Sequence, residues 1–594
     1  MNVAITGEGI VSAIGVGKEA VLQSLLQGKT GIGAMRHLRS THHELPVGEV
    51  HLSNREMKER LGIEADRMMS RTALLGMLAI HQALREAGIA DSTAVNCKRL
   101  RIALVSGTTV GGMDITEQCF DRLEELEDAE FLRHHDCGNS SRMMAEHFGI
   151  FSDVATISTA CSSAANALML GARLLKAGQA DIVVAGGTEA LSRFHLNGFR
   201  SLMILDHERC RPFDATRAGL NLGEGAAYVV MEGEAVARKR GAEPHAFLTG
   251  YGNACDAFHH TAWSENGEGA YLAMKEALAV AHLAPADIQY VNAHGTGTPN
   301  NDQSESVALG RIFGNNLPPV SSTKAFTGHT TSASGSIEAV ICLLAMKHAF
   351  IPANLGWRNI MDNGFKPCMG KTDVVLHHVL CNSFGFGGND SALILSACPT
   401  TTADDADVIK AAAGDKEIKV LSRVSIDSEQ RLTDIRKYVT PLEARRMGKL
   451  MKSSLLSSLE ALEQAGIGSP DAIITGTAYG CLEISEKLMI QIREEGEEML
   501  KPTYFMQSTH NTIGSNIAIK THCHGYNITY TQERRSLEWA VRDAELLLRS
   551  GRAKTVLVGC HDESTATFNS LLEKAGESSA PMVNSIAMVL SCGE

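Results

Sequence analysis

The sequence predicts an α/β protein in which helices cover both faces of a largely parallel sheet. Strand-like apolar runs at residues 101–107, 180–187 and 226–232 alternate with amphipathic helical patterns at 73–88 and 164–178, and both helices end at glycine. Alternation of this kind is typical of strands joined by helical crossovers. The composition, with 44% apolar and 21% charged residues, is that of a globular protein.

Length, charge and cysteine usage narrow the class further. The 594 residues are enough for several domains. We find no uninterrupted apolar stretch of the ~18 residues that a membrane span requires. The start, MNVAITGEG, resembles a strand and a turn rather than a signal peptide. The 14 scattered cysteines form no CxxC pair, which indicates reduced thiols and a cytoplasmic location. The net charge of −13 argues against nucleic acid as a partner.

The tail of the chain repeats its beginning. Four segments of the tail align with four early segments: 444–467 with 66–89, 475–481 with 106–112, 553–563 with 180–190, and 586–594 with 227–235. A stretch rich in Thr, Asp and Ala separates the two regions. We therefore expect a first domain at 1–397 (halves about 1–240 and 241–397), a linker at 398–415, and a half-domain at 416–594 that copies about the first 235 residues.

The stretch ISTACSSAANAL (157–168) places Cys161 where a strand gives way to a helix. The N-terminus of a helix stabilises a thiolate and can hold an oxyanion, which suits a nucleophile that forms a thioester. An arbitrary cysteine is more often a buried structural residue. The rest of the chain decides between the two interpretations.

Four motifs, taken together, resemble the elongating β-ketoacyl-acyl-carrier-protein synthases of the thiolase superfamily. They are TACSSA around Cys161, AHGTGTPNND (293–302), SSTKAFTGHTTSASGSIEA (321–339) and NSFGFGGND (382–390). They stand in the order and spacing of that family, and the resemblance covers residues 1 to about 397. It implies a thiolase-like fold with αβαβα layers, to which the tail adds a thiolase-like half-domain.

The resemblance also implies the chemistry of the site. Cys161 would accept an acyl group and condense it with malonyl on an acyl carrier protein, with loss of carbon dioxide. His294 and His329 match the pair of imidazoles that would stabilise the enolate without a metal. Lys324 matches the family's lysine at this corner, and Glu338 stands where the family has a buried acid.

Further positions follow from the same motifs. By resemblance, the N–H groups of Phe386 and Cys161 form an oxyanion hole, and the Phe386 ring gates the acyl pocket. Thr296 and Thr298 match positions that bind phosphopantetheine, Val110 falls on the acyl tunnel, and Phe384 is expected to support the site. Trp263 stands where the family has proline, so we expect a narrower mouth.

Substrates would arrive on the phosphopantetheine of the carrier protein, as acyl- and malonyl-carrier thioesters, and no separate cofactor or metal is expected. The adjacent histidine pairs 42–43 and 377–378 lack zinc-ligand spacing. The basic residues that could dock the carrier form a thin cluster, and for each of them an ordinary surface charge is the stronger interpretation: Lys58, Arg60, Arg67, Arg71, Arg209 and Arg217.

The tail lacks counterparts of HGTGT, TGH and GFGG, so we expect no condensation there. Arg534 stands opposite Cys161, and Tyr479 opposite Val110, as if a tunnel were plugged. The tail resembles a chain-length factor, which would make a pseudo-heterodimer within one chain or between swapped chains, or leave the first domain to form a homodimer. A decaying duplication that only shields an apolar face is the alternative.

Three other interpretations of the first domain are weaker. A degradative thiolase uses two cysteines, whereas the C-terminal glycine-rich motif has none. An initiating synthase would have asparagine in place of His329. A non-elongating carrier-binding partner or scaffold for another synthase would not need Cys161, His294 and Lys324 together.

Overall fold

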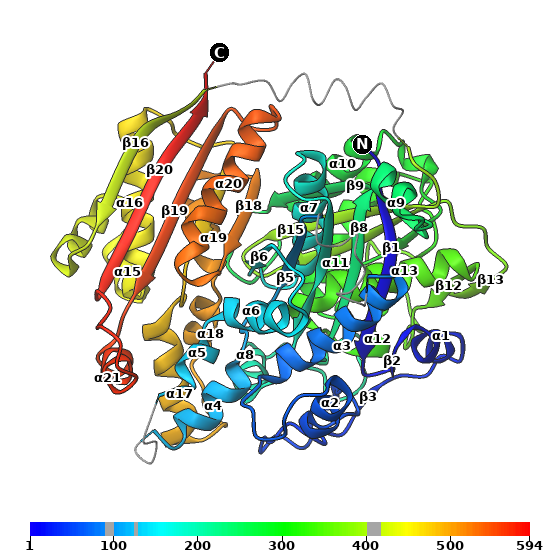
Figure 1. Cartoon of the computed structure of the whole chain (residues 1–594), viewed down its shortest axis with the longest axis horizontal. Helices are drawn as coiled ribbons and strands as arrows, with labels where there is room; N and C mark the ends of the chain where they lie inside the picture. Colours follow the sequence, from blue (N-terminus) through cyan, green and yellow to red (C-terminus); the bar gives the residue numbers. More distant parts are fainter. Residues whose placement is uncertain (90–99, 124–128, 401–416, 594) are drawn as a thin grey trace.

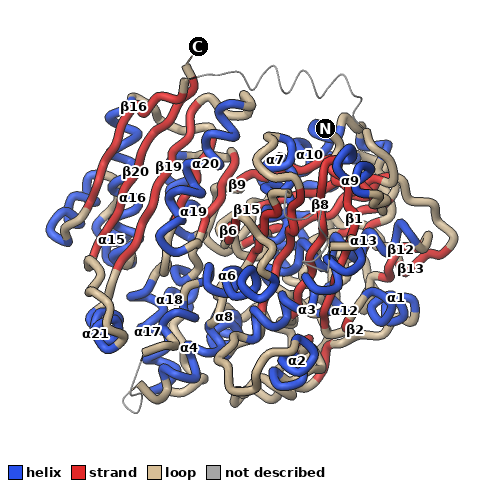
Figure 2. Tube along the Cα trace, in the orientation of Figure 1, coloured by secondary structure: helices blue, strands red, loops and turns tan. Residues whose placement is uncertain are grey.

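The computed structural model describes residues 1–89, 100–123, 129–400 and 417–593. We call residues 1–400 the first part and residues 417–593 the tail. Figure 1 shows the tail, coloured yellow to red, standing beside the first part, and Figure 2 shows strands running through both. Among the described residues, no helix is long and apolar enough to cross a membrane.

One sixteen-stranded sheet runs through both parts. In the first part its order is β11 (Val320–Ser321), β10 (Tyr290–Asn292), β14 (His378–Gly385), β15 (Asn389–Ser396), β9 (Ala246–Cys255), β1 (Val3–Ser12), β8 (Gly225–Gly233), β7 (Ile182–Glu189), β5 (Ile102–Gly107) and β6 (Asp153–Ile157), with β2 (Gly15–Val16) beside β1. The tail continues with β18 (Tyr526–Tyr530), β17 (Ala472–Gly476), β19 (Thr555–Glu563), β20 (Val583–Cys592) and β16 (Ile418–Ile426). Two small sheets pair β3 (Ile32–Gly33) with β4 (Val47–Gly48) and β12 (Phe350–Ala353) with β13 (Met369–Thr372).

The helices of the first part are α1 (Lys18–Leu26), α2 (Asn54–Leu61), α3 (Arg71–Glu86), α4 (Met113–Phe120), α5 (Leu132–His135), α6 (Cys137–Phe148), α7 (Ser163–Lys176), α8 (Arg193–Ser201), α9 (Glu234–Arg240), α10 (Glu268–Ala281), α11 (Pro299–Phe313), α12 (Lys324–Thr327) and α13 (Ser334–Lys347). Those of the tail are α15 (Pro441–Arg446), α16 (Lys449–Ala465), α17 (Leu482–Glu495), α18 (Pro502–Ser508), α19 (Thr512–Thr521), α20 (Ser536–Arg549) and α21 (Ala566–Lys574).

The first part has the expected αβαβα layers. Helices α7 and α13 form the central layer, where their apolar side chains share one core with strands from both halves. Helix α3 covers the outer face of β1, β5, β7 and β8, and α10 with α11 covers the outer face of the other half. Because each layer of strands lies between two layers of helices, the strands are buried on both sides and have nearly continuous apolar sequences.

The sheet is mixed, which corrects the expectation of a largely parallel one. Strand β5 is parallel to β6 and β7, and β10 is parallel to β11 and β14. The strands between these groups, β8, β1, β9 and β15, pair antiparallel. An antiparallel strand buried on both faces shows the same apolar run as a parallel one, so the sequence pattern did not separate them.

The tail repeats the strand pairing of the first half. Strand β17 is parallel to β18 and β19, as β5 is to β6 and β7, and β20 pairs antiparallel with β19 as β8 does with β7. Helices α16 and α19 cover one face, and α20 covers the other with Trp539 in its core.

The two parts join where equivalent strands meet, a contact that we call the seam. Strand β6 runs antiparallel to β18, with Ile157 opposite Tyr530. Across the seam, the N–H of Trp539 Nε1 donates to Val154 O at 2.8 Å. The Arg173 guanidinium pairs with the buried Asp543 carboxylate at 2.8 Å. The tail therefore covers an otherwise open sheet edge, the kind of edge that folded proteins protect.

Candidate active site

Cys161 lies on the turn that joins β6 to α7. The strand ends at Ile157, and the helix begins at Ser163. Ala160 has a φ of 51°, a left-handed conformation that residues with a Cβ rarely adopt. The turn places Cys161 at the N-terminal end of α7, where the helix dipole favours negative charge.

The Cys161 thiol is buried and therefore protonated at neutral pH. The residue is 4% exposed. Burial raises the pKa of the thiol to about 12, while the Lys324 ammonium and the N–H of Phe386 oppose the rise. A neighbouring group must take the proton when the sulfur attacks, because the thiolate is the nucleophilic form.

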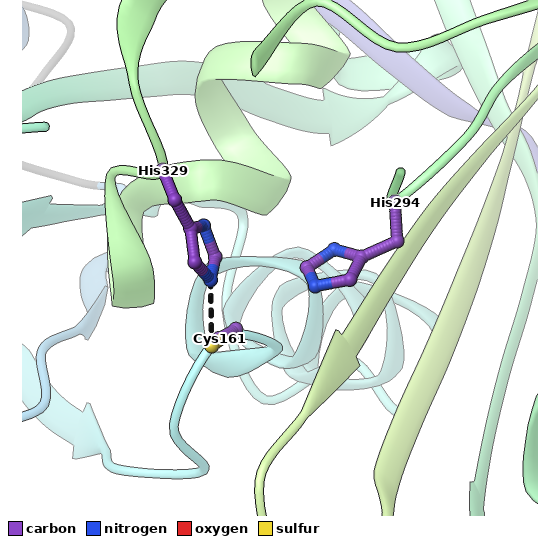
Figure 3. Close-up of side chains that lie close together, drawn as sticks. All are labelled: Cys161, His294 and His329. Carbon is purple, nitrogen blue, oxygen red and sulfur yellow. Dashed lines mark hydrogen bonds between the residues drawn. The ribbon is translucent and has the colours of Figure 1, made fainter. Parts of the chain in front are cut away.

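His329 provides such a group. Its Nε2 lies 3.0 Å from Cys161 Sγ, the contact dashed in Figure 3. Its Nδ1 lies 3.1 Å from Ser334 Oγ, and its backbone N–H donates to Asn221 O at 2.7 Å. Burial and then the charge of Lys324 hold the pKa of His329 well below its usual range, so the ring is neutral.

His294 approaches the same space from the opposite side (Figure 3), with its ring centroid 5.3 Å from that of His329. Lys324 Nζ lies 3.2 Å from His294 Nδ1. An ammonium can only donate, so Nδ1 accepts and Nε2 carries the ring proton. Nε2 is buried and has no hydrogen-bond partner among the described residues. The site thus holds a neutral donor ready for negative charge that develops beside Cys161.

Glu338 holds Lys324 in place. The Glu338 Oε1 lies 2.6 Å from Lys324 Nζ, and both side chains are buried. Burial raises the pKa of Glu338 to about 7, and the neighbouring ammonium opposes that rise. Because the Glu338 carboxyl group holds the Lys324 ammonium beside His294, the lysine fixes the tautomer of that ring.

The loop 385–388, which we call the gate loop, joins β14 to β15 beside the cysteine. A Cβ on Gly385 would lie 2.8 Å from Thr159 O and 3.2 Å from Cys161 N, so only glycine permits this approach. The backbone N–H groups of Phe386 and Cys161 lie near the sulfur, and both lower the pKa of the thiol against the effect of burial. Two such donors around one atom have the arrangement of an oxyanion hole.

The Phe386 ring is enclosed by aromatic side chains. It stacks on Phe199 with centroids 5.5 Å apart, and the Trp263 ring lies 5.9 Å away. Trp263 is buried, and its Nε1 donates to Asp390 Oδ1 at 3.3 Å. The tryptophan at the expected proline position therefore forms part of the wall against which Phe386 rests.

The remaining residues expected at the site surround this centre. The Oγ1 atoms of Thr296 and Thr298 lie 2.9 Å apart, and both residues are buried. The Phe384 ring lies 5.7 Å from that of His294. Val110 is buried in an apolar cluster that also contains Phe386.

The tail contributes to that cluster, which our motif analysis did not predict. Leu488, Met489, Ile492 and Phe505 of the tail belong to the same apolar cluster as Val110. The Phe505 ring lies 5.2 Å from that of Phe199, and a Cβ on Gly198 would lie 2.0 Å from Phe505. No motif marks these tail residues, because only their position at the seam brings them to the site.

The turn of the tail that corresponds to the Cys161 turn has no catalytic side chains around it among the described residues. Arg534 is exposed, and Glu533 has a φ of 47°, the same left-handed turn as Ala160. The backbone of the corner has therefore persisted while its nucleophile has not. The Tyr479 ring packs 4.8 Å from that of Phe568 in α21.

Cys161, His294 and His329 also offer three ligand atoms within 4.8 Å of one another. A thiolate with two imidazoles is a set that zinc can accept. The Lys324 ammonium argues against a bound metal cation, because this buried positive charge lies only 3.2 Å from His294 Nδ1 and would repel the metal. The electrostatics therefore fit an anionic intermediate better than a metal.

The candidate docking residues are not equivalent. Arg71 is buried and forms a bidentate pair with Glu224, at 2.8 Å from Nε and 2.6 Å from Nη2, so it is unavailable to a carrier protein. Its position at the start of α3 explains why the sequence suggested a surface residue. Arg217 is partly buried and donates to Pro299 O at 2.9 Å. Arg60, Arg67 and Arg209 are exposed.

Comparison with protein families gives three matches along the chain. Residues 1–237 match "Beta-ketoacyl synthase, N-terminal domain" and residues 245–358 match "Beta-ketoacyl synthase, C-terminal domain". Residues 423–594 match another family that carries the same description as the first, "Beta-ketoacyl synthase, N-terminal domain".

Curated relatives cover the first part. The "3-oxoacyl-[acyl-carrier-protein] synthase 2" of Vibrio harveyi is 32% identical over 410 residues, which are 66% of this chain and 98% of that protein. The protein of the same name from Rhizobium meliloti strain 1021 is 33% identical over 425 residues, again 66% and 98%.

Solved structures show the same similarity. "The ishigamide ketosynthase/chain length factor" matches with a TM-score of 0.61 and 29% identity, over 66% of this chain and 98% of that one. The ketosynthase ApeO, solved with its chain length factor ApeC from Xenorhabdus doucetiae, matches with a TM-score of 0.57 and 32% identity, over 67% and 98%. "PfaC Keto synthase-Chain length factor" shares only 16% identity but covers 100% of this chain and 78% of its own, with a TM-score of 0.79, so the fold extends through the tail.

Proposed function

This chain belongs to the β-ketoacyl synthase family, and we propose that it joins an acyl group on Cys161 to a malonyl group on an acyl carrier protein by decarboxylative Claisen condensation. The observation that carries the proposal is the contact of 3.0 Å between Cys161 Sγ and His329 Nε2, with the free Nε2 donor of His294 beside it. The product is a fatty acyl, polyene or polyketide chain longer by the carbons that malonyl contributes. A non-elongating carrier-binding scaffold would have no use for this pair of contacts.

Acyl transfer starts from the neutral thiol. His329 Nε2 takes the proton of Cys161 as the sulfur bonds to the thioester carbonyl carbon. The N–H groups of Phe386 and Cys161 hold the resulting oxyanion. The bond to the pantetheine sulfur then breaks, and that sulfur leaves with the proton. The carrier protein supplies the phosphopantetheine, so the chain needs no cofactor of its own.

Condensation follows on the acylated cysteine. As the carbon–carbon bond to the malonyl carboxylate breaks, carbon dioxide leaves and negative charge moves to the thioester oxygen. The Nε2–H of His294 donates to that oxygen, which stabilises the enolate. The enolate carbon then attacks the acyl carbonyl, and the Cys161 sulfur leaves. The buried Lys324–Glu338 pair keeps the His294 tautomer that this step needs.

The substrate arm would enter past Trp263, with Thr296 and Thr298 binding the phosphopantetheine. This role is supported by the paired, buried hydroxyl groups of the two threonines, which follow His294 closely in the chain. The exposed arginines near this entrance, such as Arg209, are available to an acidic carrier protein. The described cysteines form no disulfide, which supports a cytoplasmic location.

The Phe386 ring is the proposed gate of the acyl pocket. In Phe386→Ala, we expect discrimination between short and long acyl thioesters to fall by about 2- to 10-fold, because the aromatic packing on Phe199 contributes about 0.5–1.5 kcal/mol. Acylation of Cys161 by a series of acyl-carrier substrates, followed by mass spectrometry, measures this. An unchanged chain-length preference would remove Phe386 from the gating role.

The tail is the proposed chain-length factor. It supports this role by placing Phe505 in the apolar cluster of Val110 and Phe386, where it would form the far wall of the acyl pocket. A tail that only shielded the sheet edge would need the β6–β18 contact but not this aromatic wall.

Phe505→Ala should therefore shift the products to longer chains. Removing a buried ring also costs about 3–5 kcal/mol of stability, so Phe505→Leu provides a milder variant with the same expected direction. Phe568→Ala, a buried phenylalanine of the tail that packs on Tyr479 away from Phe386, is the matched control. Analysis of products after a fixed number of turnovers decides the matter: identical chain lengths in all variants would leave the tail a structural role only.

A further inference from the structure

The gate loop is held from two sides, and one of these is the tail. From the first part, Asp256 N–H donates to Gly388 O, and Gly387 N–H donates to His260 O, both at 2.7 Å. From the tail, Asn511 Nδ2 donates to Phe386 O at 2.7 Å, and Ser515 Oγ donates to Gly387 O at 2.8 Å. Two successive carbonyls of the loop are thus bound by side chains of the other part.

The tail side chains are firmly placed. Asn511 is the N-cap residue of α19, and Ser515 lies one turn later, so both face the loop. Both are 2% exposed, which excludes water as a competitor for the bonds. Helix α19 packs in the core of the tail through Ile513 and Ile517. The donors therefore cannot follow the loop if it moves.

The fit between loop and helix is close. A Cβ on Gly387 would lie 2.9 Å from Asn511 Nδ2 and 2.9 Å from Ser515 Cβ. Gly387 also has a φ of +83°, which glycine adopts without cost. The glycine of this motif therefore serves the contact with the tail as well as the turn.

We propose that Asn511 and Ser515 form a latch through which the tail keeps the gate loop closed. The inference rests on the proposed gating by Phe386. Moving Phe386 aside requires its carbonyl and that of Gly387 to leave these donors, whose buried groups would then stay unpaired. The tail thus governs when the gate opens, in addition to forming the wall of the pocket. Asn511 and Ser515 are positioning residues, because they act through the loop and not on the substrate.

Alkylation of Cys161 by iodoacetamide in the full-length protein tests the latch, because the reagent reaches the buried thiol only when the gate opens. We expect Asn511→Ala and Ser515→Ala each to raise the labelling rate about fivefold, because one hydrogen bond contributes about 1 kcal/mol net. The double variant should raise it about tenfold or more. Ser515→Thr keeps the hydroxyl and should restore the original rate. Mass spectrometry of the Cys161 peptide gives the rates.

Two controls separate the latch from its premise. Arg535→Gln removes an exposed seam contact with Asp153, remote from the gate loop, and should leave labelling unchanged. Phe386→Ala should accelerate labelling whether or not the latch exists. Acceleration in Phe386→Ala but not in the double variant overturns the latch alone. An unchanged rate in Phe386→Ala overturns both the gate and the latch. If Arg535→Gln accelerates labelling as much as the double variant does, the effect belongs to the seam as a whole, and the latch is overturned.

Discussion

Replacing Cys161 with alanine is expected to abolish acyl transfer and condensation, with a loss of about 10⁴-fold or more in turnover, the scale reached when a covalent nucleophile is removed. The variant removes the atom that lies 3.0 Å from His329 Nε2 and near the backbone N–H of Phe386. The donors around it remain, so binding of the carrier substrate should persist. Elongation of an acyl-carrier substrate, followed by mass spectrometry of the product, measures the loss.

A second buried cysteine provides the control. Cys342 lies in α13, in the central core, and Cys342→Ala makes the same change of volume there. We expect this variant to retain elongation, while both variants unfold at similar temperatures. If Cys161→Ala still elongates, the sulfur is not the acyl carrier, and the mechanism proposed here is wrong. Loss of activity in both variants would instead indicate damage to the core.

The fold class was predictable because its evidence is local. Apolar runs and helix-ending glycines reveal the elements, and the repeated segments in the tail reveal the second sheet region. The thiolase-like fold is confirmed by the layers and by the matching structures. Strand direction was not predictable, since β8 and β7 have equally apolar sequences although they pair antiparallel.

The candidate site could be predicted as far as its residues lie in motifs. Cys161, His294 and His329 stand in three separate segments, and each motif carries its own glycines or small residues. The structure brings these three side chains together. Burial was harder to foresee: Arg71 has the sequence surroundings of a surface residue, yet Glu224, far along the chain, draws it into the interior.

Contacts across the seam could not be predicted residue by residue. Phe505, Asn511 and Ser515 belong to no motif, and their roles depend on the angle at which β18 meets β6. Repetition in the sequence indicated that the tail would pair with the first part. It did not indicate which side chains would reach the gate loop, because these contacts have no counterpart within either part alone.

The second large effect is expected at His294, which the structure separates from the acyl-transfer step. His329 contacts the thiol, whereas His294 Nε2 has no partner among the described residues until an anion forms beside Cys161. His294→Ala should therefore reduce decarboxylation of malonyl-carrier substrate by about 10²–10³-fold, the loss typical of one oxyanion donor. Acylation of Cys161 should continue at a similar rate.

Release of labelled carbon dioxide and the mass of the acylated Cys161 peptide measure the two half-reactions separately. His294→Asn places an amide donor in the same pocket and should recover part of the decarboxylation, because a neutral N–H is what the enolate needs. The exposed His377 supplies the control, since His377→Ala removes an imidazole without touching the site. Equal loss of both half-reactions in a folded His294→Ala protein would contradict the division of roles. In that case His294 would serve to build the site, and the Lys324–Glu338 pair would support its structure and not a tautomer.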